Sequence, residues 1–446
     1  MSETWGKGTL NNTIGWGQGA CDNTINWGKS QKDSSVAASW SGDTDISGCS
    51  GADPVPFMYK TEVASGVQTD TGIFRIQKTG GDLTIDWGDG ATTTITAATN
   101  QNTILHTYND GTNTDVENPV VKIGAEGETG TLTEIYYQAG STTFASELLE
   151  IQQWGTKHSF FSLNFSNSTQ MQLTATDALI TTSLNSTFFN CTAMTGNSSM
   201  NSWDVSNVTT FAATFQSCRN FNQDLYSWDV SSGTNFRNMF YLNINFNGNI
   251  NGWDFTNSTT MTSMLGLASS FNQPVNNWDL AGANKNLYRI FYNATSFSQD
   301  VSGWDVSKVT SFDSSFENTE INNDLSSWVL TEATTITRML FSNASFNQDI
   351  GAMTLGTNLT SVYRLFYQAT GLSDSNYTST IVGWANQVYN NSAPYNVNGS
   401  EIATGASLQF DNSADGGANF ADAGEARDYL TGATAGWTIS GDTRIN

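Results

Sequence analysis

Five aspartates recur at nearly constant intervals through the middle of the chain, each directly after a tryptophan. They are Asp204, Asp229, Asp254, Asp279 and Asp305. If equivalent residues stack in neighbouring strands, the carboxylates lie about 4.8 Å apart, where like charges repel. One interpretation is that each carboxylate accepts N–H groups of the turn that follows it. The alternative is an acidic stripe that binds Ca²⁺ or sugar hydroxyls. Val329 and Thr354 take the next two places, so the stripe ends before the sixth repeat.

Few other residues could do chemistry. His106 and His158 are the only histidines, and we expect His106 to be a structural residue at a strand end. There is no H-E-x-x-H, no G-x-S-x-G and no phosphate-binding glycine loop with a lysine. Paired carboxylates hydrolyse glycosides, but a chain rich in aspartate offers such pairs by accident. We therefore expect a protein that is not an enzyme and has no catalytic residues, no metal ligands and no cofactor, with Ca²⁺ at the aspartates left open.

The cysteines predict neither a disulfide scaffold nor a metal site. Four cysteines are too few for a scaffold in 446 residues, and no C-x-x-C pair is present. Cys191 and Cys218 fall at equivalent places in adjacent repeats. Later repeats have mostly small residues there, so both cysteines should be buried and reduced, as small hydrophobic residues.

Charge and composition limit the classes of partner. Acidic residues outnumber basic ones 41 to 17, which gives a formal net charge of −24. A nucleic-acid binder needs lysine and arginine to displace counterions from phosphates, so nucleic acid is not an expected partner. No run of 18 apolar residues exists, and we expect no membrane insertion. The aromatic content of 12% indicates a folded chain, and the turn-rich composition favours β-structure.

Tryptophan marks a repeat of about 25 residues. Trp203, Trp228, Trp253, Trp278, Trp304 and Trp328 are followed in step by Met353, and each has an apolar residue two places later. A second apolar column runs Phe188, Phe215, Phe240, Leu265, Phe291, Phe316, Phe341 and Phe366. Val208, Phe211 and Phe215 recur at i, i+3 and i+7, which predicts a short helical turn after each strand. No repeat can bury its tryptophan alone, so the repeats should stack and need caps at both ends.

The runs WDVSNVTTFAATF, WDVSKVTSFDSSF and ASFNQDI resemble the Mycoplasma-type repeat of BspA-like surface proteins, a leucine-rich-like family. The tail segments YTSTIVGWANQ and GEARDYLTGATAGWTIS resemble the end of that family's proteins. The resemblance implies a leucine-rich-like repeat solenoid over 186–372, with an N-terminal cap over 141–185 and a C-terminal cap over 373–446. Family members are generally surface or adhesive proteins, so the resemblance informs the fold more than the ligand.

Upstream, GGDLTIDWGDGATTTIT and ILHTY are similar to a polycystic-kidney-disease-type (PKD-like) β-sandwich of immunoglobulin-like form. Asp89–Gly90 would supply the tight turn between two alternating strands. The fold class expected for the whole chain is therefore mainly β, with this sandwich over 58–140 preceding the solenoid.

The first 57 residues carry a Trp-Gly repeat, with Trp5, Trp16 and Trp27 spaced 11 residues apart. So short a segment cannot bury a stable core, so we expect 1–57 to dock on another protein through these tryptophans. Similar Trp-Gly-rich N-termini occur in virion proteins of phages that infect marine Bacteroidetes. The N-terminus also has no secretory signal pattern.

These patterns predict a phage virion protein, such as a tail fibre, head fibre, spike or capsid decoration. Its N-terminal segment would bind other virion proteins, and its solenoid would recognise a host-surface polysaccharide or protein, with homo-oligomer formation left open. The alternatives are an exported adhesin on a bacterial cell surface and, third, a phage polysaccharide depolymerase.

Overall fold

The computed structural model describes residues 56–62, 69–96, 101–109, 111–114, 116–124, 128–137, 148–156, 158–282, 285–390, 396–403, 407–409, 419–420, 422–440 and 442–445. All of them belong to the unit Val55–Asn446. The prediction of a mainly β chain is confirmed, because only α1 and α2 are α-helices among the described elements. No described helix is long and apolar enough to cross a membrane.

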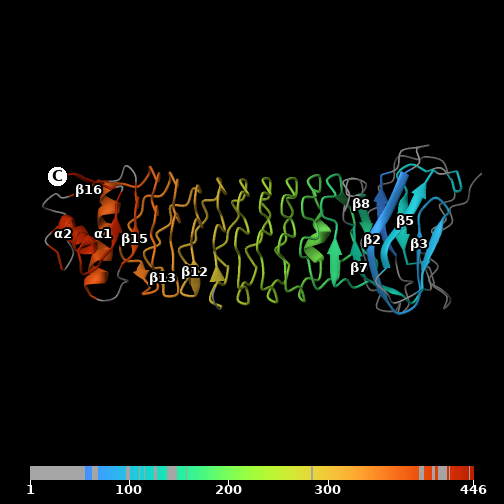
Figure 1. The fold of residues 1–446 in the computed structure, drawn as a ribbon, viewed down its shortest axis with the longest axis horizontal. Helices are drawn as coiled ribbons and strands as arrows, with labels where there is room; N and C mark the ends of the chain where they lie inside the picture. Colours follow the sequence, from blue (N-terminus) through green and yellow to red (C-terminus); the bar gives the residue numbers. More distant parts are fainter. Residues whose placement is uncertain are drawn as a thin grey trace, which may run out of the picture. The chain divides into compact units, whose positions relative to one another are not determined.

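Two sheets come first, drawn in blue and cyan in Figure 1. One sheet joins, in spatial order, β10 (Gln172–Leu173), β8 (Leu148–Gln153), β1 (Phe57–Thr61), β6 (Val120–Ile123), β3 (Leu83–Asp86) and β4 (Thr92–Ile95). The other joins β5 (Gln101–Tyr108), β2 (Thr69–Thr79), β7 (Thr131–Tyr136) and β9 (Ser162–Asn164). Pairing is antiparallel except for β10 with β8 and β7 with β9, which are parallel. The sheets therefore continue into the first parallel strands of the repeats.

Alternation along the strands builds the core between these sheets. Phe57 and Tyr59 of β1 are buried, as are Leu83 and Ile85 of β3, while the residues between them are partly exposed. The ring of Tyr59 lies edge-on to that of Tyr137, which follows β7 in the other sheet, with centroids 5.8 Å apart. This is the packing that a period of two residues predicts for strands with one buried face.

The repeats lie side by side in one stack, drawn from green to orange in Figure 1. Alternate backbone N–H groups of one repeat donate to the next repeat: Phe211, Ala213 and Phe215 donate to the carbonyls of Asn235, Arg237 and Met239 at 2.8, 2.8 and 2.9 Å. The N–H groups between them donate within the repeat: Thr214 donates to the carbonyl of Phe211 at 3.3 Å, three residues earlier, and Ala212 donates to the hydroxyl of Thr210 at 3.4 Å. Each repeat thus satisfies its own backbone only when it has neighbours on both sides.

The predicted helical turn is wrong. Instead of a helix, the segment is a run of tight turns in which two residues per repeat have positive φ, such as Ala213 (φ 54°) and Ser217 (φ 63°). A non-glycine residue in the left-handed region ends a right-handed helix. The alternate donation of N–H groups to the next repeat also removes every second intrahelical donor. The apolar spacing of i, i+3 and i+7 therefore comes from successive tight turns, each closed by a bond from an N–H group to the carbonyl three residues earlier, and not from a helix.

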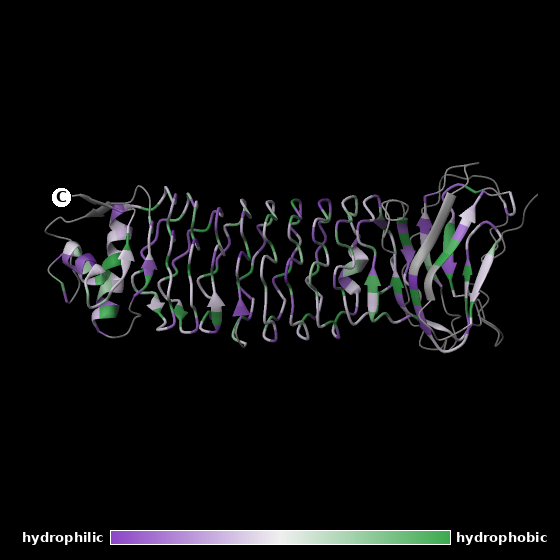
Figure 2. Cartoon of the chain, in the orientation of Figure 1, coloured by the Kyte–Doolittle hydropathy of each residue, from purple (hydrophilic) through white to green (hydrophobic). Residues whose placement is uncertain are grey.

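Regular strands within the stack are very short. They are β11 (Lys285–Asn286), β12 (Val309–Ser311), β13 (Val329–Leu330) and β14 (Thr354–Leu355). The stack also contains one short 3₁₀ helix, η2 (Ser198–Ser202). The predicted strand at Trp-x-apolar forms only at β13 and at β14, where Met353 replaces the tryptophan. In other repeats, single pairs of residues form isolated β-bridges instead, such as Asp254 with Asp279. Figure 2 shows hydrophobic and hydrophilic residues alternating along the repeats.

The tryptophan column is held by hydrogen bonds as well as by burial. The indole Nε1 of each tryptophan from 228 to 328 donates to a buried carbonyl of the preceding repeat. The acceptors are Met200 for Trp228 (2.6 Å), Leu225 for Trp253 (2.8 Å), Ile250 for Trp278 (3.1 Å), Val275 for Trp304 (2.9 Å) and Val301 for Trp328 (3.3 Å). Met353 has no such donor, and in the place one repeat after it Trp384 of α1 donates to the carbonyl of Ile350 (3.2 Å).

One member of the second apolar column was assigned to the wrong residue. Leu340, not Phe341, is buried at this place, and Phe341 lies on the outer side of the stack. The reason is that Trp328 follows Trp304 after 24 residues, so the register in this repeat falls one residue earlier. The small-residue column shifts likewise from Ala344 to the buried Asn343.

The C-terminal segment packs α1 (Asp374–Tyr389) and α2 (Ala423–Thr431) with β15 (Asn398–Gly399), β16 (Ser407–Gln409), β17 (Thr438–Ile439) and β18 (Thr443–Ile445). Ser373 and Asp422 cap the two helices through side-chain oxygens. Arg427 donates two hydrogen bonds of 2.7 Å to Asp442, which also accepts from Tyr377 at 3.1 Å. This pair ties α2 and the end of the chain to α1.

Candidate functional site

The five aspartates of the row occupy equivalent places in successive repeats, and all are exposed. The residues at both ends of the row are exposed and apolar: Ile180 is bridged to Asp204, and Val329 follows Asp305 one repeat later. The structure thus places the predicted residues in one line along the stack.

Each of these carboxylates accepts the N–H group two residues later. The bonds are Ser206 to Asp204 (3.2 Å), Ser231 to Asp229 (3.1 Å), Thr256 to Asp254 (2.7 Å), Ala281 to Asp279 (2.9 Å) and Ser307 to Asp305 (3.0 Å). The Ser231 hydroxyl adds a second bond to Asp229 at 2.6 Å, and these bonds lower the pKa of that carboxyl. The geometry is the turn cap expected of aspartate before a turn. Among the residues that the structure describes, no group of three or more His, Cys, Asp or Glu side chains could hold a metal ion.

A second set of residues, of which the sequence patterns singled out only Phe341, lies along another line of the stack. We call it the Tyr–Arg face. It comprises Tyr241, Tyr288, Arg289, Tyr292, Arg338, Phe341, Tyr363, Arg364 and Tyr367, with the carboxylates Asp313, Glu317 and Glu401.

Backbone hydrogen bonds place these residues in register. Asn318 donates to the carbonyl of Phe341, and Ser342 donates to that of Tyr367, each one repeat further on. These bonds define a column of equivalent residues: in each repeat, the N–H group of the residue that follows a column member donates to the carbonyl of the next member. The column runs Tyr241, Gly266, Tyr292, Glu317, Phe341 and Tyr367. Arg289, Ser314, Arg338 and Arg364 form the neighbouring column.

Each guanidinium of the Tyr–Arg face lies over aromatic rings. Arg289 is 5.0 Å from the ring centroid of Tyr288 and 4.8 Å from that of Tyr292. Arg338 lies 4.0 Å from the centroid of Phe341. Arg364 lies 5.0 and 4.9 Å from those of Tyr363 and Tyr367. These distances are within the range of attractive cation–π contact.

The same guanidiniums have acidic neighbours. Arg338 forms two hydrogen bonds with Glu317, at 3.0 and 2.6 Å, and Arg364 pairs with Glu401. Burial raises the pKa of Asp313, and the nearby Arg289 and Arg338 oppose that rise. Three guanidiniums and three carboxylates therefore face one another, and the surface is formally close to neutral although the whole chain carries −24.

A signal for the Tyr–Arg face was present in the sequence. Arginine with an aromatic residue three places later occurs in four repeats, as RNMF (237–240), RIFY (289–292), RMLF (338–341) and RLFY (364–367), and the last three belong to the Tyr–Arg face. The arginine and aromatic positions of these three alternate with columns of buried residues and are themselves partly exposed, so apolar periodicity does not indicate them as a set.

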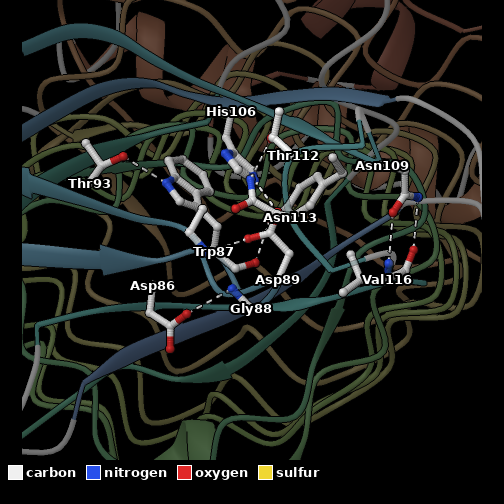
Figure 3. Close-up of polar contacts among 12 residues, drawn as sticks. Asp86, Trp87, Gly88, Asp89, Thr93, His106, Asn109, Thr112, Asn113 and Val116 are labelled. Atoms are coloured by element: carbon white, nitrogen blue, oxygen red, sulfur yellow. Dashed lines mark hydrogen bonds and ion pairs between the residues drawn. The ribbon is translucent and has the colours of Figure 1, made fainter.

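Polar contacts in the sandwich gather at the hairpin between β3 and β4 (Figure 3). Asp89 Oδ2 is 2.8 Å from His106 Nε2, and its Oδ1 accepts the Ala91 N–H at 2.9 Å. The His106 imidazole stacks on the indole of Trp87 with centroids 4.8 Å apart. Tyr108 donates to the Trp87 carbonyl at 2.8 Å, and its pKa is raised by burial and then by Asp89. The pairs tie β5 to the hairpin, as a structural His106 requires.

Two other sets of predicted residues add nothing to a functional site. Trp5, Trp16 and Trp27 lie outside the described residues, as does nearly all of the 1–57 segment. Cys191 and Cys218 are buried free thiols; Cys218 Sγ donates to the Phe188 carbonyl at 2.9 Å.

The repeats match a known family. Residues 182–286 and 283–384 both match the family model described as "Mycoplasma protein of unknown function, DUF285". Residues 182–384 therefore carry repeats of this family. The matched segments contain the whole aspartate row and all of the Tyr–Arg face except Glu401, and they confirm the resemblance to the Mycoplasma-type repeat. No curated protein matches the chain, and no solved structure does.

Proposed function

We propose that this protein is a non-enzymatic recognition protein that binds a macromolecular surface through its repeat stack. The observation that carries this proposal is the Tyr–Arg face. Tyrosine and arginine are the residue types that most often supply binding energy at interfaces. Ring contacts and ion pairs already hold the three guanidiniums in place, so a ligand would immobilise few side chains on binding.

We also propose that the protein is part of a virion. In this proposal 1–57 docks on another virion protein through Trp5, Trp16 and Trp27, a PKD-like sandwich follows, and the leucine-rich-like stack makes contact with the host. The Trp-Gly repeat supports this placement by its similarity to phage virion proteins. The competing proposal is an adhesin exposed on a bacterial cell, which the surface proteins of the BspA-like family support.

Binding to whole cells tests recognition by the Tyr–Arg face. Labelled full-length protein would be incubated with a panel of bacterial strains and washed, and the retained fraction measured. The variant Arg289→Ala/Tyr292→Ala should lose at least tenfold in retention on strains that bind the wild type. Tyr226→Ala is the matched control, because Tyr226 is 54% exposed and is not part of the face. Equal retention of the double variant and the wild type on every strain would refute recognition by this face.

Fractionation separates the two locations. Antibodies against the stack would be used on purified phage particles and on outer fractions of cells that carry the gene. A signal in particles that disappears when 1–57 is deleted supports the virion proposal. A signal confined to cell envelopes supports the adhesin.

A polysaccharide depolymerase is the second candidate, and one observation favours it. Burial and then the nearby Glu317 raise the pKa of Asp313, as a catalytic acid needs. Release of reducing ends from a bound polysaccharide, abolished by Asp313→Asn, would establish this activity. Binding without any release of reducing ends would leave the non-enzymatic proposal standing.

A further inference from the structure

The aromatic residues of the Tyr–Arg face are arranged periodically along the stack. In the column defined by backbone hydrogen bonds, Tyr241, Tyr292 and Phe341 alternate with Gly266 and Glu317. One repeat advances the stack by about 4.8 Å, so these aromatic residues recur every ~9.6 Å. A Cβ added at Gly266 would lie 3.1 Å from Cδ2 of Tyr241, so the ring of Tyr241 lies against the space left by the glycine. From Tyr241 to Phe341 an aromatic residue therefore lies at every second repeat, and Tyr367 follows Phe341 directly, with its ring stacked on that of Phe341 at a centroid distance of 5.4 Å.

We propose that the Tyr–Arg face binds an extended, uncharged polysaccharide that lies along the stack; this inference rests on the proposed function and names its ligand class. In an extended β-linked polysaccharide, successive sugars are turned over, so the same apolar C–H face recurs at every second residue. The length of this two-sugar repeat is close to the two-repeat spacing of the aromatic side chains. A polymer that matches the period would contact several rings at once and gain affinity by multivalency.

The paired charges favour sugar hydroxyls over other ligands. The aromatic sites of Tyr292 and Phe341 each have a guanidinium that donates and a nearby carboxylate that accepts, as in Arg338 with Glu317 beside Phe341. A sugar hydroxyl can donate and accept at once, so it can hydrogen-bond to both members of such a pair. A protein partner would instead have to desolvate two ion pairs, Arg338 with Glu317 and Arg364 with Glu401, which is costly unless each is satisfied again.

The charge of the molecule disfavours an acidic polysaccharide. Outside this formally neutral face, the chain carries a formal charge of −24, which repels a polyanion at low salt. An uncharged polymer meets no such barrier. Its binding should therefore change little with ionic strength, whereas binding of a polyanion through arginine should weaken as salt screens the charges.

Native gel electrophoresis tests the proposal with the full-length chain. Gels would contain hydroxyethyl cellulose, glucomannan, xylan or alginate, and retardation gives the dissociation constant. We expect retardation by at least one of the three uncharged polymers, retained in 0.5 M NaCl, and none by alginate. Tyr292→Ala/Phe341→Ala should weaken that binding at least tenfold, and Tyr226→Ala should leave it unchanged. A thermal melt of each variant checks that it is folded.

Hydrogen exchange of the wild-type chain adds a measurement that needs no variant. The retarding polymer should protect amides at 288–292 and 338–342, and leave those of the turns after Asp204 and Asp229 unchanged. The proposal is overturned by no retardation in any uncharged polymer, by retardation in alginate alone, or by protection confined to other surfaces. If cell binding is lost in Arg289→Ala/Tyr292→Ala while no uncharged polymer retards the wild type, recognition stands and the ligand class is wrong.

Discussion

Replacement of Trp253 by phenylalanine tests whether the indole hydrogen bonds stabilise the stack. Trp253 is buried, its ring stacks on that of Trp228 with centroids 6.1 Å apart, and its Nε1 donates to the Leu225 carbonyl at 2.8 Å. Phenylalanine retains an aromatic ring but has no donor. The substitution therefore loses ring volume and one hydrogen bond to the preceding repeat.

Trp203 is the matched control within the same column. It is also buried, and it stacks on the other side of Trp228 at 5.9 Å, but its Nε1 has no hydrogen-bond partner among the described residues. Trp203→Phe therefore loses similar ring volume and no hydrogen bond. Trp203→Phe also removes an unpaired buried N–H group, so the difference between the two variants combines the lost bond of Trp253 with the relief of that unpaired donor at Trp203.

The expected difference follows from the acceptor. The Leu225 carbonyl also accepts the backbone N–H of Trp228 at 3.1 Å, so it keeps one partner when the indole is lost. The lost bond should then contribute as an ordinary hydrogen bond does, so the difference should be at least about 0.5–1.5 kcal/mol. Trp253→Phe should be the less stable variant by this amount.

Urea unfolding followed by circular dichroism measures this difference, provided that the slope with denaturant is the same in both variants. A repeat stack can lose cooperativity, and a changed slope would show it. Equal stability of the two variants, or lower stability of Trp203→Phe, would refute the idea that tryptophan recurs for its N–H group as well as its size.

Four further outcomes are expected. Cys218→Ala should cost less than about 2 kcal/mol in urea unfolding, because alanine occupies the same column at Ala268 and Ala294; a loss above about 3 kcal/mol, as for a native disulfide, would contradict this. Lys285 is buried and donates to the carbonyls of Phe255, Thr256 and Ser258 at 2.6, 3.1 and 2.9 Å, and burial lowers its pKa. Because the pKa of Lys285 is lower in the folded chain than in the unfolded chain, the free energy of unfolding rises with pH between the folded pKa and 10.5. The wild type should therefore gain stability relative to Lys285→Met from pH 8 to 10.5. An unchanged difference in unfolding free energy between the two proteins over this range would contradict the burial effect. The lowered pKa of Asp229 means that its contribution is present above pH 3.8 and lost as the pH falls through the folded value, so Asp229→Asn and the wild type should converge in melting temperature towards pH 2. Calcium and EDTA should give the same melting temperature, and a calcium-dependent rise lost in Asp229→Asn/Asp254→Asn would favour the cation stripe instead.

Apolar periodicity was enough to predict which residues are buried in the stack. The tryptophans, the residues two places after them and nearly all of the phenylalanine column are buried as the spacing indicates. The exception, Leu340 in place of Phe341, arose in a repeat that is one residue shorter. Burial depends on the identity of side chains, which a sequence shows directly.

Backbone conformation was less predictable from the same residues. The left-handed positions hold Ala213, Ser263, Arg289 and Leu242 as well as asparagine, although glycine or asparagine is the usual signal for positive φ. Such residues adopt φ near 55° only because the bonds between repeats hold the backbone there. That constraint comes from neighbouring repeats, so no single repeat contains the information, and a helical turn was the better local prediction.

The two candidate surfaces differ for the same physical reason. The aspartates form local bonds to the residue two places later, so their role as turn caps can be inferred within one repeat. The Tyr–Arg face depends on contacts between repeats: Arg338 reaches back to Glu317, and Phe341 stacks on Tyr367 one repeat further on with centroids 5.4 Å apart. The residue types on this face change from repeat to repeat because each side chain contacts side chains of the neighbouring repeats rather than the backbone of its own turn. A surface built from such pairs appears only when the repeats are stacked, and its variation along the stack is what could let it select one ligand over another.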